Sequence, residues 1–95
     1  MSRQIVSEGQ YLAVFNSTHR VMKAEALLKT NRLDILLIPA PRAIQTDCGL
    51  AIRFDENELG VVMKALDENS LLPAFLCRMH DGNYITVEEY ADENH

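Results

Sequence analysis

The chain has 95 residues, enough for one domain with a modest core. Its formal net charge is −5 and its Lys and Arg residues form no cluster, which argues against nucleic-acid binding and against docking on an anionic membrane. No apolar stretch has the length of a membrane span, and MSRQIVSEGQ lacks the apolar run of a signal peptide. We therefore expect a protein of the reducing cytoplasm.

Cysteine and histidine usage gives no sign of a metal. In a reducing compartment Cys48 and Cys77 are expected to be free thiols. The three histidines are scattered without ligand spacing, so we predict neither a metal nor a cofactor. No repeat or linker divides the sequence. We expect a single domain over 1–95, with a core at 10–79 and a hairpin strand and acidic tail at 80–95.

The first half of the chain alternates strand, helix and strand signals. YLAVFN (11–16) is rich in strand formers, and Ser17 after it is typical of a helix N-cap. Apolar residues then recur at helical spacing until Asn31, which favours helix termination. DILLIPAP (34–41) is apolar on both alternating faces and predicts a strand that ends where Pro39 removes a backbone donor.

The next segment predicts a third strand and a second helix. LAIRF (50–54) alternates as a strand does, and Asp55 with Glu58 forms a variant of the capping box. An apolar helical stripe follows at Leu59, Val62, Met63 and Leu66. Gly60 costs this helix about 1 kcal/mol relative to alanine, which we attribute to a close approach between helix and sheet.

The end of the chain completes the fold. PAFLCRMHDGNYITVEEY (73–90) predicts two strands joined by Asp81-Gly82, a strong hairpin signal. The element order is then β-α-β-β-α-β plus an extra C-terminal strand. This order predicts an α+β, ferredoxin-like sandwich, with two helices on one face of an antiparallel sheet.

This topology brings several polar residues to one edge of the sheet. The first two strands end there and the third begins there, so the first helix's N-terminus should lie near the loop 39–47 and Cys48. A helix N-terminus attracts negative charge, and Arg42 adds a positive charge from the loop. Both favour a reactive thiolate, whereas the charge of Asp47 opposes it.

Cys48 and Gly49 each have two readings, whereas Cys77 has one. Cys48 is either a reactive thiol or a small buried residue that fits a strand start. Cys77 lies in an apolar strand and is expected in the core. Gly49 allows a positive φ or a close backbone approach.

The polar residues of the same edge also have more than one reading. Ser17 is explained by its capping role, with anion binding beside Thr18 as a second role. A neutral His19 could accept the Cys48 proton. Arg42 is either an anion-binding residue or a solvated loop residue.

At these residues the chain resembles the putative selenium/sulfur carrier-like family of small bacterial proteins. The similarity covers about residues 10–79: a strand, Ser-Thr-His, an Ala-Glu helix, a Pro-x-Pro-Arg loop and a Cys-Gly before the third strand. The matching residues are Ser17, Thr18, His19, Ala24, Glu25, Pro39, Pro41, Arg42, Cys48 and Gly49. The resemblance implies that Cys48 carries sulfur or selenium as a persulfide or perselenide.

Two functions remain as hypotheses. In the first, a carrier without enzymatic turnover takes sulfane sulfur or selenium from a donor protein on Cys48 and passes it to an acceptor protein, while Ser17, Thr18 and Arg42 hold the terminal sulfur. In the second, Cys48 is structural and the same edge binds an anionic ligand or a partner protein. Apolar residues on both faces of 34–41 also predict a homodimer that covers the open face of the sheet.

Overall fold

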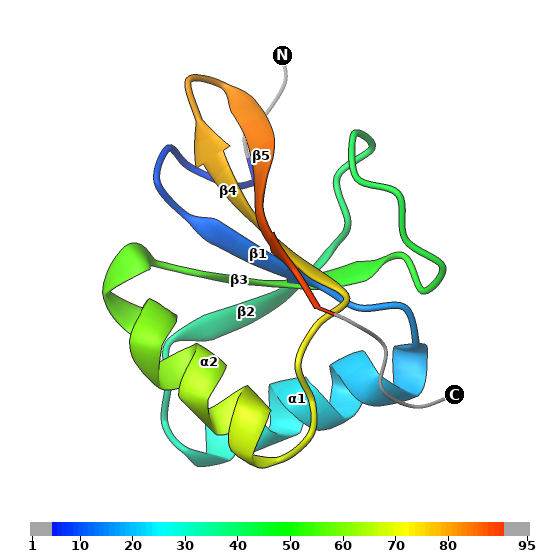
Figure 1. Ribbon diagram of the computed structural model, residues 1–95, viewed down its shortest axis with the longest axis vertical. Helices are drawn as coiled ribbons and strands as arrows, with labels where there is room; N and C mark the ends of the chain where they lie inside the picture. Colours follow the sequence, from blue (N-terminus) through cyan, green and yellow to red (C-terminus); the bar gives the residue numbers. More distant parts are fainter. Residues whose placement is uncertain (1–4, 91–95) are drawn as a thin grey trace.

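The computed structural model describes residues 5–90, which form an antiparallel five-stranded sheet and two α-helices (Figure 1). In chain order the elements are β1 (Tyr11–Val14), α1 (Thr18–Thr30), β2 (Ile35–Pro39), β3 (Leu50–Phe54), the 3₁₀ helix η1 (Glu56–Glu58), α2 (Leu59–Glu68), β4 (Phe75–His80) and β5 (Asn83–Glu89). The predicted α+β class and the extra strand are confirmed, whereas η1 was not predicted. The end of the predicted acidic tail lies outside the described residues.

The order of the strands in the sheet is β2-β3-β1-β4-β5. The last residue of β1, Val14, pairs with Ala51 near the start of β3 and with Phe75 at the start of β4. Pro39, the last residue of β2, pairs with Leu50. The end of β1, the end of β2 and the starts of β3 and β4 therefore share one edge, which we call the Val14 edge.

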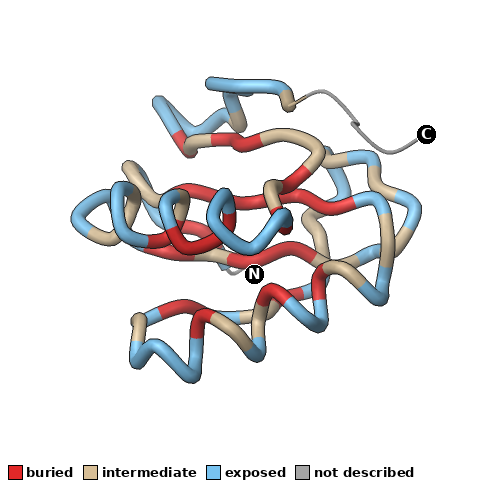
Figure 2. The backbone as a smooth tube through the Cα atoms, turned by 60° about the horizontal axis from the view of Figure 1, so that its bottom comes forward, coloured by how far each residue is buried: buried red, intermediate tan, exposed pale blue. Residues whose placement is uncertain are grey.

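Both helices pack on the same face of the sheet. On β1, Tyr11 and Ala13 face this side, together with Phe15, and their cluster contains buried residues of α1 and α2. Figure 2 shows the central strands of the sheet largely buried, and the outer surfaces of the helices and most of β5 exposed. The side chains facing the helices in this cluster are Val21, Ala24, Leu28, Val62, Ala65 and Leu66 on the helices and Ile35, Ile52, Phe54 and Leu76 on the strands.

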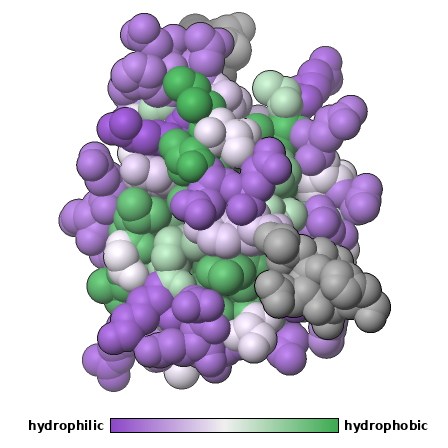
Figure 3. All heavy atoms as spheres, viewed as in Figure 1, coloured by the Kyte–Doolittle hydropathy of each residue, from purple (hydrophilic) through white to green (hydrophobic). Residues whose placement is uncertain are grey.

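The opposite face of the sheet is covered in part by other segments of the same chain. Leu12 and Val14 of β1 lie there in a second cluster with Ile38, and Val6 and Ile44 pack in this cluster. Figure 3 shows one face of the molecule, where hydrophilic residues break the apolar ones into separate patches. This packing leaves less of the face open to a second copy of the chain. The homodimer stays a prediction.

Helix α1 is capped as its sequence predicts. The Ser17 hydroxyl accepts a hydrogen bond from the Arg20 backbone N–H at 3.3 Å, and Asn31 is the C-cap. The Arg20 guanidinium donates to the carbonyls of Ser70 and Leu72 at 3.1 and 3.2 Å. Arg20 thus ties the first turn of α1 to the connection between α2 and β4, a role that sequence analysis missed.

Two predictions for the second helix are wrong. The Asp55 side chain makes no capping hydrogen bond, and its carboxylate accepts one from the Gln10 side chain at 2.7 Å. The chain passes through η1 before α2 begins at Leu59. Gly60 is exposed, and a Cβ atom added to it would meet nothing within 4 Å. No close approach between helix and sheet requires this glycine.

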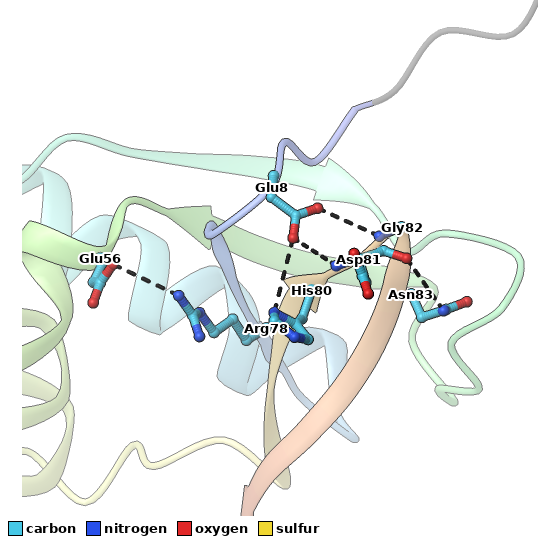
Figure 4. Close-up of polar contacts among 7 residues, drawn as sticks. All are labelled: Glu8, Glu56, Arg78, His80, Asp81, Gly82 and Asn83. Carbon is cyan, nitrogen blue, oxygen red and sulfur yellow. Dashed lines mark hydrogen bonds and ion pairs between the residues drawn. The ribbon is translucent and has the colours of Figure 1, made fainter.

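The β4–β5 hairpin turns at Asp81 and Gly82, as predicted. Both residues have a positive φ, +56° and +78°, as a two-residue type I′ turn requires. Glu8 accepts hydrogen bonds from both of their backbone N–H groups and lies 3.9 Å from His80 Nδ1 (Figure 4). The bond from Asp81 is the main cause that holds the pKa of Glu8 below its usual 4.5, with Gly82 and His80 adding to it and partial desolvation opposing it.

Strand β5 forms an edge of the sheet and contains an irregularity. Cys77 pairs with Thr86 whereas Leu76 pairs with Glu88, so Val87 has no partner in the ladder with β4. Such a β-bulge bends and twists the strand that carries it. Six of the seven residues of β5, all except Tyr84, are exposed, so β5 contributes little to either core.

Replacing Gly60 by alanine is expected to stabilise the protein. Gly60 lies in α2 with an ordinary helical backbone and free space around it, so the lower backbone entropy of alanine in the unfolded chain gives a gain of a few tenths to about 1 kcal/mol. Urea denaturation measures it. Gly82→Ala is the control, because its φ of +78° predicts a loss instead. A loss of stability in Gly60→Ala would mean that the glycine has a role that its surroundings do not show.

The Glu8 carboxylate is expected to stabilise the fold in a pH-dependent way. Because its pKa is lower in the folded state, the contribution is fully present above about pH 4.5 and is lost as pH falls through the folded value. Glu8→Gln should therefore be less stable than the wild type at neutral pH, and the difference should shrink in acid. Urea midpoints across this range test it. Glu56→Gln, which removes an exposed acid 3.8 Å from Arg78, should show a smaller difference. A Glu8→Gln difference that does not change with pH would contradict the assignment.

Candidate functional site

Cys48 lies at the Val14 edge, two residues before β3, and is half-buried. Its Sγ lies 3.3 Å from the carbonyl oxygen of Phe15 and 3.4 Å from that of Leu50. Phe15 directly follows β1, and Ser17, two residues later, is the N-cap of α1. The thiol therefore sits against the junction of β1 and α1, where the topology predicted it.

Thr46 completes the surroundings of the thiol. Its hydroxyl donates to the Phe15 carbonyl at 2.7 Å, accepts from the Cys48 backbone N–H at 3.4 Å and lies 3.5 Å from the Cys48 Sγ. Sequence analysis did not select Thr46. A threonine that hydrogen-bonds the backbone two residues further on is a common turn pattern, and this local signal was the one available.

The three residues at the start of α1 lie beside this site but turn partly to solvent. Ser17 is half-buried and acts as the cap, whereas Thr18 and His19 are exposed. Within residues 5–90, no hydrogen bond or ion pair connects His19 with Cys48. The role of His19 as a proton acceptor therefore stays a prediction without a contact to support it.

The loop between β2 and β3 holds the remaining predicted residues. Its base is closed by the Ala40 N–H, which donates to the Gly49 carbonyl at 2.9 Å, and Gly49 has a φ of +72°. Arg42 is exposed in a turn closed by a 2.9 Å bond from the Ile44 N–H to the Pro41 carbonyl. Figure 1 shows the loop, in green, projecting beyond the sheet. In the described part of the chain Arg42 makes no contact with the Cys48 thiol.

The groups around Cys48 are mainly hydrogen-bond acceptors. Two carbonyl oxygens and the Thr46 oxygen can each accept from an S–H group. Among the side chains described, only the Thr46 hydroxyl lies close enough to donate to the sulfur. Asp47 is exposed next to it. The arrangement therefore offers an S–H group several acceptors, whereas a thiolate would have one hydroxyl and the field of the α1 N-terminus.

Cys77 lies in a different environment, on the opposite face of the sheet. It is 1% exposed in the second core cluster, as predicted for a core residue. Burial raises the pKa of the Cys77 thiol, and a long 3.9 Å contact with the Thr86 hydroxyl opposes this shift only in part. Cys77 is therefore a poor nucleophile at neutral pH.

A shallow groove of about 440 Å³ lies on the face away from the helices. One wall is the loop segment 43–45, and the other belongs to β5. The lining residues are Ala43, Ile44, Gln45, Phe75, Cys77, Asn83, Tyr84 and Thr86. None of these side chains is a Lys, Arg, Asp or Glu, so the groove offers apolar contacts and neutral hydrogen-bonding groups.

Residues 5–90 contain neither a cluster of metal ligands nor a helix able to span a membrane. These residues contain no group of three or more His, Cys, Asp or Glu side chains arranged to hold a metal ion. Neither of the described helices has the length and apolar character needed to cross a membrane.

Comparison with known proteins places the chain in a family. A family model described as "Putative Se/S carrier protein-like" matches residues 10–78, which is more than half of the chain. No curated protein and no solved structure matched. The matched segment runs from the residue before β1 into β4, includes Cys48 and Arg42, and excludes β5. The chain thus belongs to the putative Se/S carrier protein-like family.

Proposed function

We propose that this protein is a sulfur or selenium carrier that uses Cys48 as its carrying thiol. The observation that supports this most directly is the family match over residues 10–78, within which Cys48 is the half-buried cysteine at the Val14 edge. The strand order β2-β3-β1-β4, with both helices on one face, supports a ferredoxin-like assignment of the core as part of the same proposal.

The transfer is a thiol exchange that needs no oxidant. The Cys48 thiolate attacks the outer sulfur of a donor persulfide; a bond forms between this sulfur and Cys48 Sγ, and the donor's sulfur–sulfur bond breaks. The donor leaves as a thiolate and takes up a proton, which balances the proton that Cys48 has lost. An acceptor thiolate then attacks the outer sulfur and releases Cys48. The same steps hold for selenium.

The two cysteines differ in burial, and this difference bears on which of them can carry sulfur. A partner's persulfide must reach the sulfur atom, and Cys48 is half-buried at an edge of the sheet. Cys77 is 1% exposed and its pKa is raised by burial, so both access and thiolate content are lower. The carrier role therefore belongs to Cys48.

The outer sulfur of the persulfide carries negative charge, and we propose that residues around the α1 N-terminus bind it. Ser17 and Thr18 are close in the chain to Phe15, which contacts Cys48. Arg42 supplies a positive charge from the loop, while His19 and Gly49 border the same edge. In this role the protein acts in the cytoplasm as an accessory to donor and acceptor proteins, without turnover of its own.

A second candidate is a binding module in which Cys48 is structural. Two observations favour it: the carbonyl acceptors around Cys48 suit a protonated, inert thiol, and the groove offers a separate surface for a ligand. This candidate predicts that Cys48 takes up no sulfur, so the following experiment distinguishes the two.

Incubation with a persulfide donor is expected to add one sulfur to Cys48. Intact mass spectrometry followed by peptide mapping detects the added sulfur and its position. Cys48→Ser should abolish it, because the remaining thiol is 1% exposed. Cys77→Ser is the matched control and should load as the wild type does. Equal sulfur loading of Cys48→Ser and Cys77→Ser, or no loading of either variant, would contradict the carrier role of Cys48.

Ser17→Ala is expected to have two separable effects. Loss of the cap should lower the free energy of unfolding by about 1 kcal/mol, as measured by urea denaturation. If Ser17 also holds the outer sulfur, as proposed, the Cys48 persulfide should decay faster in this variant. Ser17→Asn keeps a capping side chain without the hydroxyl, so it should retain most of the stability but show the faster decay. Faster decay in Ser17→Ala alone would assign Ser17 to capping only.

A further inference from the structure

We propose that Thr46 is a positioning residue that controls how readily the Cys48 thiol gives up its proton. This inference deepens the proposed function, because that function needs a thiolate at Cys48. It starts from three contacts of one hydroxyl group: with the Phe15 carbonyl, the Cys48 backbone N–H and the Cys48 sulfur.

The hydroxyl has a single hydrogen atom, so its contacts compete. In the resting state this hydrogen goes to the Phe15 carbonyl, where the distance of 2.7 Å is the shortest of the three. The sulfur, 3.5 Å away, can then interact with Thr46 only by donating its own S–H to the oxygen. The sulfur also has the Phe15 and Leu50 carbonyls as acceptors at 3.3 and 3.4 Å. The thiol form is therefore well satisfied.

Loss of the proton reverses this balance. A thiolate can only accept hydrogen bonds, and the carbonyl oxygens beside it then offer nothing favourable. The Thr46 hydroxyl is the one side-chain donor within reach of the sulfur in the described part of the chain. Rotation about the Thr46 Cβ–Oγ1 bond turns the hydroxyl hydrogen from the Phe15 carbonyl to the Cys48 sulfur. The backbone bond from the Cys48 N–H to Thr46 Oγ1 keeps the oxygen in place during this change.

The position of Thr46 in the chain explains how its hydroxyl reaches the Cys48 sulfur. Thr46 lies two residues before Cys48, so a local turn places its hydroxyl over the following backbone. The link to Phe15 crosses 31 positions in the sequence and anchors the turn to the end of the central strand. Thr46 thus connects the loop, the thiol and the β1–α1 junction through one oxygen atom.

The test uses Thr46→Val, which keeps the shape of the side chain and removes the hydroxyl, and Thr46→Ser, which keeps the hydroxyl. Both are made in a Cys77→Ser background, so that Cys48 is the only thiol. The alkylation rate of Cys48 by iodoacetamide is measured from mildly acidic to strongly alkaline pH. Because a hydrogen bond to a charged group is worth at least about tenfold in equilibrium, Thr46→Val should hold about tenfold less thiolate at neutral pH. A more basic thiolate is also the better nucleophile, so the alkylation rate of this variant should fall by roughly three- to fourfold. Its rate profile should lie at higher pH, and Thr46→Ser should follow the parent protein.

Two controls separate this role from a structural one. The plateau rate at strongly alkaline pH, where every sulfur is a thiolate, reports access, and it should be no lower in either variant than in the parent protein. Thermal unfolding reports the loss of the bond to Phe15. A Thr46→Val profile that overlays the parent, with only a lower melting temperature, would overturn the proposal, as would a Thr46→Ser profile displaced as far as that of Thr46→Val. If Thr46→Val does not fold, Thr46→Ala provides the same comparison.

The outcome does not depend on whether Cys48 carries sulfur. Alkylation reports the thiol alone, whereas sulfur loading is followed by mass in a separate measurement. A displaced Thr46→Val profile together with no loading of the wild type would sustain the role of Thr46 and reject the carrier function. Normal loading together with unchanged profiles would do the reverse.

Discussion

The burial of β1 on both faces and its pairing along both edges is the constraint on which the rest of the structure depends. Every residue from Tyr11 to Phe15 is buried, and β3 and β4 occupy its two sides. A strand held in this way cannot shift its register without exposing one of two cores. Its end is therefore fixed in space, and the Phe15 carbonyl becomes a fixed acceptor at the Val14 edge. Thr46 and Cys48 both bind this oxygen, so the candidate site is built on the most constrained backbone of the molecule.

Much of the fold was predictable because its signals are local. Ser17 marks the start of α1 by its own side chain, and Asp81-Gly82 fixes the hairpin because few other residue pairs accept two positive φ values. The prediction failed where a distant partner decides the outcome. Asp55 was predicted to cap a helix with its side chain, but its carboxylate makes no capping hydrogen bond. It accepts a hydrogen bond from Gln10, 45 positions away.

The candidate site was also predictable only in part. Topology placed Cys48 beside the β1–α1 junction, and the structure has it there. The polar contacts of the thiol were not predictable, since the Thr46 and Cys48 bonds to Phe15 span more than thirty positions and leave no periodic pattern in the sequence. The role of Arg42 stays a prediction, because its side chain lies in an exposed turn and forms no hydrogen bond with the thiol within residues 5–90.

The bulge in β5 has a consequence for how the molecule behaves in a crowded solution. The family match ends within β4, and β5 pairs along the side of β4 that β1 leaves free, so β5 forms this edge of the sheet. The edge carries Val87, which has no partner in the ladder with β4, followed by Glu88 and Glu89. An irregular backbone and adjacent negative charges are the devices by which natural sheets resist strand-to-strand aggregation. The edge that β5 forms thus has two features that disfavour the addition of a strand from another copy of the chain.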